Sequence, residues 1–161
     1  MFQDQLALRF RQAAAEGNHQ VVLLMLGRGP RHTQAERNLV ESQGAESKKT
    51  ALHRTFESMV TLCDPDPSAA VRAIYFIEEN LTTADLSDNQ SKILSLYITA
   101  QYLLDCSPNL DITDREGVSA RQLLGRLPEQ ISWALSQARL ANDIGETIVT
   151  RVVNATPSMP N

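Results

Sequence analysis

Apolar residues of this 161-residue chain recur every three or four positions along most of its length. Phe2, Leu6, Phe10 and Ala13 are the first such series, and they share one face of a helix because a helical turn takes about 3.6 residues. No alternation of apolar and polar residues runs long enough to indicate a strand. The pattern therefore predicts an all-α protein, and 42% hydrophobic residues suffice for the core of one domain.

Capping and turn residues divide these apolar stripes into short helices. The predicted caps are Thr50, Asp66, Ser119 and either Ser87 or Asp88. Each carries a side-chain oxygen that can accept hydrogen bonds from the free amides of a helix's first turn. Gly17 ends the first helix, since glycine adopts a positive φ without strain. We expect antiparallel helices over residues 2–16, 21–26, 33–42, 50–62, 67–77, 87–105, 119–125 and 128–138, with a helical period continuing through 144–152.

The charge distribution disfavours a nucleic-acid partner. Residues 1–56 hold eight Lys/Arg against five Asp/Glu, residues 57–116 three against eleven, and residues 117–161 four against three. Nucleic-acid binders usually carry a clustered basic surplus, which a net charge of -4 does not provide. The acidic middle either attracts a basic partner or is a solvated face.

Nothing in the sequence indicates a membrane span or a signal peptide. No apolar run approaches the roughly 20 residues that a spanning helix needs. Arg9 and Arg11 interrupt the place where the apolar part of a signal peptide would lie. We therefore expect a cytoplasmic protein in which Cys63 and Cys106 are reduced, buried thiols.

Three segments share a pattern with a known repeat. They are Thr50-Ala51-Leu52-His53, the stretch AAAEGNHQVVLLML over residues 13–26, and LLDCSPNLDITDREGVSA over residues 103–120. In these segments the chain resembles the ankyrin-repeat family, whose units are about 33 residues long. Thr50 and Ser119 are 69 positions apart, close to two such periods. Lys48 stands where the family has a glycine before the Thr.

The resemblance implies a fold and a set of residues. It implies an irregular solenoid of stacked helix pairs over residues 1–154, closed by a C-terminal capping helix and followed by a disordered tail, 155–161. The implied repeats lie near 6–30, 45–80, 84–109 and 114–141. Residues with implied structural roles are Gly17, Thr50, His53 and Gly117. Residues implied to face a concave protein-binding surface are Arg54, Glu57, Arg115 and Glu116, with Arg9 and Arg11 extending it.

The residues offer no recognisable catalytic or metal-binding pattern. The two cysteines lack metal-ligand spacing with each other or with a histidine, and no glycine-rich phosphate loop is present. Glu78 and Glu79 are adjacent on a helix and point apart, so they do not form an acid–base pair. We expect no metal and no cofactor. Trp133, the single tryptophan, is either core filler in a capping helix or an exposed anchor for a partner.

These observations favour a non-enzymatic module that binds another protein through its concave face. Two alternatives stay open: a helical regulatory or inhibitory subunit, perhaps a homodimer through Trp133 and the last helix, and a small helical enzyme whose site is not recognisable from sequence. If the protein is a bacterial effector, the cytosol in which it works is that of a host cell.

Overall fold

A computed structural model describes residues 2–27, 34–76 and 82–140. Within these ranges the regular structure consists of eight α-helices and one 3-10 helix, and the prediction of an all-α protein is confirmed. The helices are α1 (Phe2–Glu16), α2 (His19–Leu26), α3 (Gln34–Glu41), α4 (Ala51–Cys63), α5 (Pro67–Ile74), η1 (Thr83–Asp85), α6 (Asp88–Leu104), α7 (Ala120–Leu124) and α8 (Glu129–Leu140).

The predicted caps begin four of these helices. Thr50, Ser87 and Ser119 accept a hydrogen bond from a first-turn amide of α4, α6 and α7, respectively. In each case the side chain of the third helical residue accepts a hydrogen bond from the backbone amide of the cap. Asp66 caps α5 without such a return bond: its side chain accepts from the Ala69 amide, and Pro67 lies in the first turn. These capping bonds satisfy amides that would otherwise lack partners, which is why these helices begin where they do.

Gly17 joins α1 to α2 and is required there on two grounds. Its φ is +73°, a conformation that costs other residues free energy. A Cβ at this position would also lie 3.1 Å from Cγ of Leu96, so the turn packs directly on α6. The short connection places α2 beside α1 and against the central helix.

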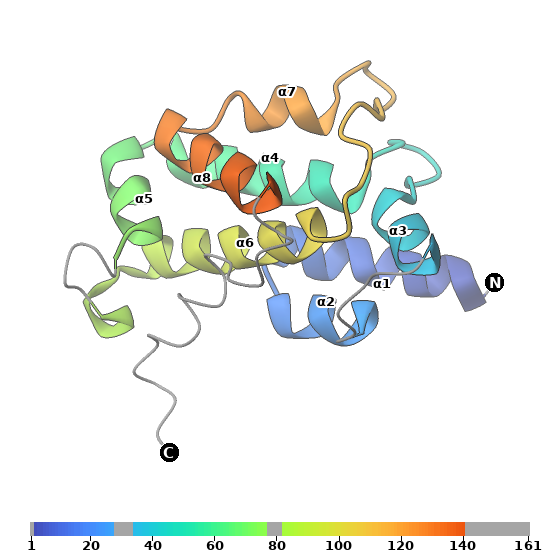
Figure 1. The fold of residues 1–161 in the computed structure, drawn as a ribbon, viewed down its shortest axis with the longest axis horizontal. Coiled ribbons are helices and arrows are strands. Elements are labelled where there is room, and N and C mark those ends of the chain that lie inside the picture. Colours follow the sequence, from blue (N-terminus) through green and yellow to red (C-terminus); the bar gives the residue numbers. More distant parts are fainter. Residues whose placement is uncertain (1, 28–33, 77–81, 141–161) are drawn as a thin grey trace.

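The helices lie in two rows (Figure 1). α1, α4 and α7 pack side by side in one row, while α2, α6 and α8 form the other. α6 packs along α4 and also contacts α1, α2, α5 and α8, which makes it the central helix of the fold. α5 covers one end of α6, and α3 contacts α4. α6 lies in the predicted repeat at 84–109, whereas α4, against which it packs, lies in the predicted repeat at 45–80.

The core runs between the two rows. Phe10, Phe56 and Tyr97, from α1, α4 and α6, have less than 1% of their surface exposed. Small residues such as Ala14 and Ala51 allow the neighbouring helices to approach closely. Cys63 and Cys106 are buried free thiols, which confirms that part of the sequence prediction.

The apolar residues of α5 face the core: Ile74 is buried together with Ala70 and Ala73, and Val71 is half-buried and packs against the core. Ile77 lies outside the described residues. One interpretation about burial needs correction. Trp133 is 59% exposed, so its interpretation as core filler is wrong. The ring extends from the helix surface because its neighbours Ile131, Ala134 and Leu135 occupy the buried face of α8.

Some predictions fall outside the described residues. These are the first residue of the helix expected over 33–42, the helical period at 144–152 and the tail at 155–161. Among the described helices, none is long and apolar enough to cross a membrane.

Candidate binding face

Two short turns precede α4 and α7, and their backbones have similar hydrogen bonds and dihedral angles. In turn 44–49 the Gly44 amide donates to the Lys49 carbonyl at 2.9 Å, and in turn 114–118 the Asp114 amide donates to the Val118 carbonyl at 2.8 Å. Each turn places a residue in the left-handed region two positions before its helix cap: Lys48 with φ +60° and Gly117 with φ +81°. The lysine therefore adopts the conformation for which glycine is usually required.

The two turns lie side by side. The Arg115 amide donates to the Ser47 carbonyl at 2.9 Å. The Gln43 side-chain amide bridges the same pair of segments, donating to the Lys48 carbonyl at 2.8 Å and the Thr113 carbonyl at 3.0 Å. These bonds join segments about seventy positions apart in the sequence into one edge of the molecule.

The buried side chain of His53 stabilises this edge through hydrogen bonds to the backbone. The side chain is fully buried, and its Nδ1 accepts from the Thr50 amide at 3.1 Å. Nε2 therefore carries the ring proton and donates it to the Val118 carbonyl at 2.8 Å. Both ring nitrogens are engaged with the backbone, so His53 has no nitrogen available as a general base or metal ligand in this arrangement.

Asp114 fixes the shape of the second turn. Its Oδ1 accepts from the amides of Glu116 and Val118, both at 2.9 Å. Burial raises the pKa of this carboxyl, but the two amide donors, together with the positive charge of Lys49, outweigh burial and leave the pKa below its ordinary value. The ionised carboxylate therefore stabilises the turn that carries Arg115.

The structure brings two of the four predicted binding residues to a common point. The Arg54 guanidinium contacts Ser47 Oγ at 3.4 Å, and Ser47 is also the residue that receives the Arg115 amide. Glu57 lies one turn further along α4, where its carboxylate pairs with Lys49 Nζ at 2.7 Å. Glu116 is exposed beside Arg115 at the tip of the second turn.

Sequence reasoning missed the residues that organise this face. Ser47, Gln43 and Lys49 belong to no motif, and their role depends on the second turn, which is remote in the sequence. The signal that was available is the cap-turn pattern itself, which occurs once before Thr50 and once before Ser119. No prediction was made for the Ser47 hydroxyl.

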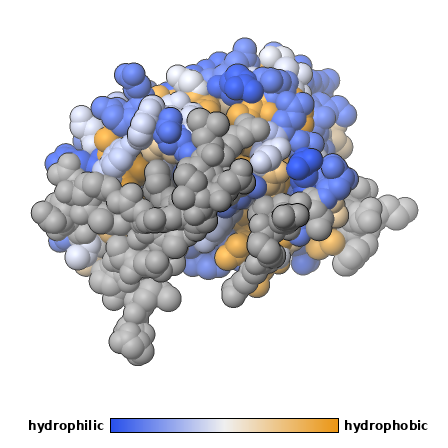
Figure 2. Space-filling model, in the orientation of Figure 1, coloured by the Kyte–Doolittle hydropathy of each residue, from blue (hydrophilic) through white to orange (hydrophobic). Residues whose placement is uncertain are grey.

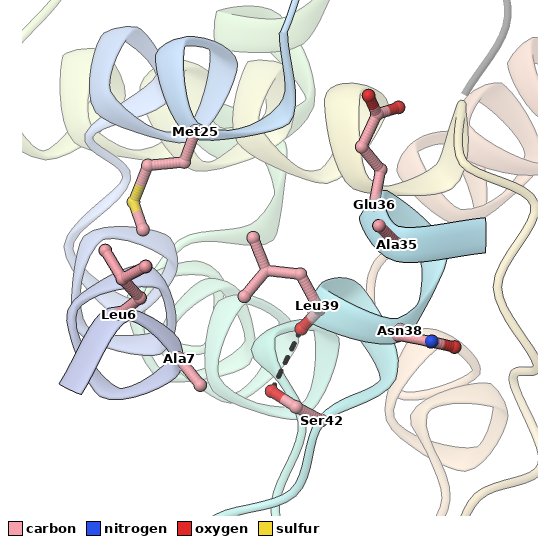
Figure 3. Close-up of a pocket in the computed structure, with 8 residues that line it drawn as sticks. All are labelled: Leu6, Ala7, Met25, Ala35, Glu36, Asn38, Leu39 and Ser42. Atoms are coloured by element: carbon pink, nitrogen blue, oxygen red, sulfur yellow. Dashed lines mark hydrogen bonds between the residues drawn. The ribbon is translucent and has the colours of Figure 1, made fainter. Parts of the chain in front are cut away.

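Apart from the paired turns, an apolar hollow lies between α1, α2 and α3. It has a volume of about 580 Å³ and is lined by Leu6, Ala7, Met25, Ala35, Glu36, Asn38, Leu39 and Ser42. Figure 3 shows Leu6, Met25 and Leu39 converging on it from the three helices. The view in Figure 2 shows hydrophobic residues at the lower right, over α2, while hydrophilic residues cover much of the upper part. The predicted binding residues do not line this hollow.

The titratable groups of the described chain do not assemble into a reactive centre. Burial raises the pKa of the Cys63 thiol to about 11 and that of Cys106 to about 12, the latter also through the Glu36 and Asp105 carboxylates. Both thiols are therefore protonated near neutral pH and poor nucleophiles. Among residues 2–27, 34–76 and 82–140, no three His, Cys, Asp or Glu side chains are grouped so that they could hold a metal ion.

The fold and this face together define an all-α protein of two helix rows with a polar edge of paired turns. No protein-family model, curated protein or solved structure matches the chain.

Proposed function

We propose that this protein is a non-enzymatic module that binds another protein through the edge formed by turns 44–49 and 114–118 and the exposed side of α4. In this proposal the pairs α1–α2, α4–α6 and α7–α8 are the layers of an irregular ankyrin-like stack, and α3 and α5 are insertions. The repeats predicted separately at 45–80 and 84–109 thus become a single layer. The observation that carries the proposal is the bond from the Arg115 amide to the Ser47 carbonyl, which sets the two turns side by side.

A surface built in this way is suited to binding a folded partner. Its turns are tied to the core by the buried His53 and by the Asp114 carboxylate, so little conformational entropy is lost when a partner binds. Arg54 and Arg115 present guanidinium groups, which are enriched among residues that dominate interface energies. Glu57 and Glu116 add opposite charge, which favours a partner with a complementary pattern.

The experiment is a capture with the Arg54→Glu, Arg115→Glu double variant. We expect the wild-type protein to capture a partner that is identified by mass spectrometry, and the purified pair to lose at least tenfold in affinity with the double variant. The matched control is Arg72→Glu with Arg126→Glu, which makes the same charge change at exposed positions of α5 and of the segment after α7. Equal affinity for both double variants contradicts the proposal, provided that circular dichroism shows both to be folded.

A second candidate is a regulatory subunit that assembles as a homodimer through α8. The observation that favours it is the 59% exposure of Trp133, a large apolar side chain of the kind that anchors interfaces. A mass that rises with protein concentration in light scattering, and that stays monomeric in Trp133→Ala, supports this candidate. A concentration-independent monomer rejects it.

A further inference from the structure

The hydroxyl of Ser47 lies among hydrogen-bond donors. Ser47 is half-buried in turn 44–49, and its Oγ accepts from the Lys49 amide at 3.3 Å and from Arg54 Nη2 at 3.4 Å. The carbonyl of the same residue accepts the Arg115 amide. One serine thus contacts a guanidinium, a backbone amide of its own turn and the neighbouring turn.

A second guanidinium approaches the same point from α1. A Cβ built on Gly44 would lie 3.2 Å from Ser47 Oγ and 3.9 Å from Arg11 Nε, so both groups border the small space beside Gly44. The Arg11 side chain is held in place by a hydrogen bond that its Nη1 donates to Ser42 Oγ at 3.0 Å. Arg54 of α4 therefore contacts the Ser47 hydroxyl directly, and the Arg11 guanidinium of α1 borders the same small space beside Gly44.

We propose that Ser47 is a site of phosphorylation, and that Arg54, Arg11 and the Lys49 amide form a cradle for the phosphate. The modification requires a protein kinase and a nucleoside triphosphate. Ser47 Oγ attacks the γ-phosphorus, and the new O–P bond forms as the bond to the β–γ bridging oxygen breaks. The nucleoside diphosphate leaves with that electron pair, and the hydroxyl proton passes to the base of the kinase.

The charges around Ser47 favour the modified state. A phosphoserine carries roughly -1.5 to -2 charges near neutral pH and three strong acceptor oxygens, and guanidinium groups bind such oxygens in pairs. The carboxylates nearby include Glu46, which is exposed to solvent, and Glu57, which is paired with Lys49 at 2.7 Å. Asp114 of the neighbouring turn is held by the amides of Glu116 and Val118. The exposed neighbours Glu46 and Lys48 leave the turn accessible to a kinase.

Phosphorylation would also change the edge of the molecule. The phosphate draws the Arg54 guanidinium toward turn 44–49, and Ser47 holds the Arg115 amide, so a local charge change reaches both turns. The inference stands apart from the proposed function, because it concerns the turn itself and is tested without a partner.

The test uses the full chain with phosphoserine encoded at position 47. We expect its thermal midpoint to lie about 2–4 °C above that of the unmodified chain, the shift typical of one moderately strong interaction in a protein of this size. Arg54→Gln removes at least half of this rise. Arg126→Gln, a matched loss of one exposed charge away from the turn, preserves it.

Phosphorus NMR provides a readout that a merely structural effect would not move. A phosphate held by two guanidiniums titrates with a second pKa below the ordinary value of about 6, and Arg54→Gln returns it toward that value. Peptide mapping of the protein isolated from its own cells, with phosphatases inhibited, is expected to find phosphate on Ser47. An unchanged or lowered midpoint, a phosphate pKa of 6 or above, or an unmodified Ser47 in that map overturns the proposal.

Discussion

At the scale of single residues, His53 contributes most to the paired turns. The side chain accepts from the Thr50 amide, donates to the Val118 carbonyl and is fully buried. His53→Ala leaves both backbone groups without these partners and opens a cavity, so we expect a loss of about 2–4 kcal/mol in the free energy of unfolding. Urea denaturation measures it. The exposed neighbour serves as control: Arg54→Ala is expected to change stability by less than about 0.5 kcal/mol.

A loss below about 1 kcal/mol in His53→Ala contradicts this role. Such a result would mean that the two turns pair without the histidine.

For Lys48 we expect a substitution that raises the free energy of unfolding. Its φ of +60° costs an L-residue roughly 1–2 kcal/mol, while glycine adopts it freely but loses somewhat more chain entropy on folding. We therefore expect Lys48→Gly to raise the free energy of unfolding by about 0.5–1 kcal/mol. Lys49→Gly, which lacks a positive φ and breaks the pair with Glu57, is expected to lower it. Stabilisation by both substitutions, or by neither, contradicts the assignment of strain to Lys48.

At the scale of elements, the turn before α7 gives a pH dependence. The pKa of Asp114 lies below its ordinary value of 3.8, so the folded state binds fewer protons than the unfolded state as the pH falls toward that value. The stability that this carboxylate contributes is complete above the unfolded pKa and is lost as the pH falls through the folded pKa. Asp114→Asn should therefore be less stable at about pH 6 and should lose less on acidification to about pH 3.

Urea unfolding at several pH values measures this difference between Asp114→Asn and the wild type. If the two stability curves run parallel, the carboxylate does not hold the turn.

Helix positions could be predicted from the sequence because their causes are local. Thr50, Asp66, Ser87 and Ser119 cap helices in the structure through bonds to amides no more than three residues away. The buried face of α5 could not be predicted as well. That face is selected by contact with α6 and α8, so the small Ala70 and Ala73 are fully buried while Val71 packs against the core only in part.

In the candidate site, too, the residues fixed by a local pattern could be predicted and those that depend on tertiary contacts could not. Arg54 and Arg115 could be named from a motif, whereas Ser47 acquires its contacts only when turns about seventy positions apart meet. The hollow lined by Leu6, Met25 and Leu39 requires three helices to be placed before it exists. Trp133 could not be assigned from its pattern, because exposure depends on which face of α8 meets the core.

At the scale of the whole molecule, the two rows of helices around α6 present three surfaces that a partner could bind. They are the edge of paired turns, the apolar hollow between α1, α2 and α3, and the exposed Trp133 on α8. The edge differs from the other two because hydrogen bonds from opposite parts of the chain fix its shape. We therefore propose that a partner binds the edge, with the hollow and Trp133 as alternative surfaces elsewhere on the molecule.

Hydrogen–deuterium exchange of the protein with its captured partner distinguishes these surfaces most directly. We expect slowed exchange on binding at residues 44–49, at residues 114–118 and along the exposed side of α4, with little change elsewhere. Protection concentrated instead in α2 and α3, or around Trp133 in α8, would contradict it.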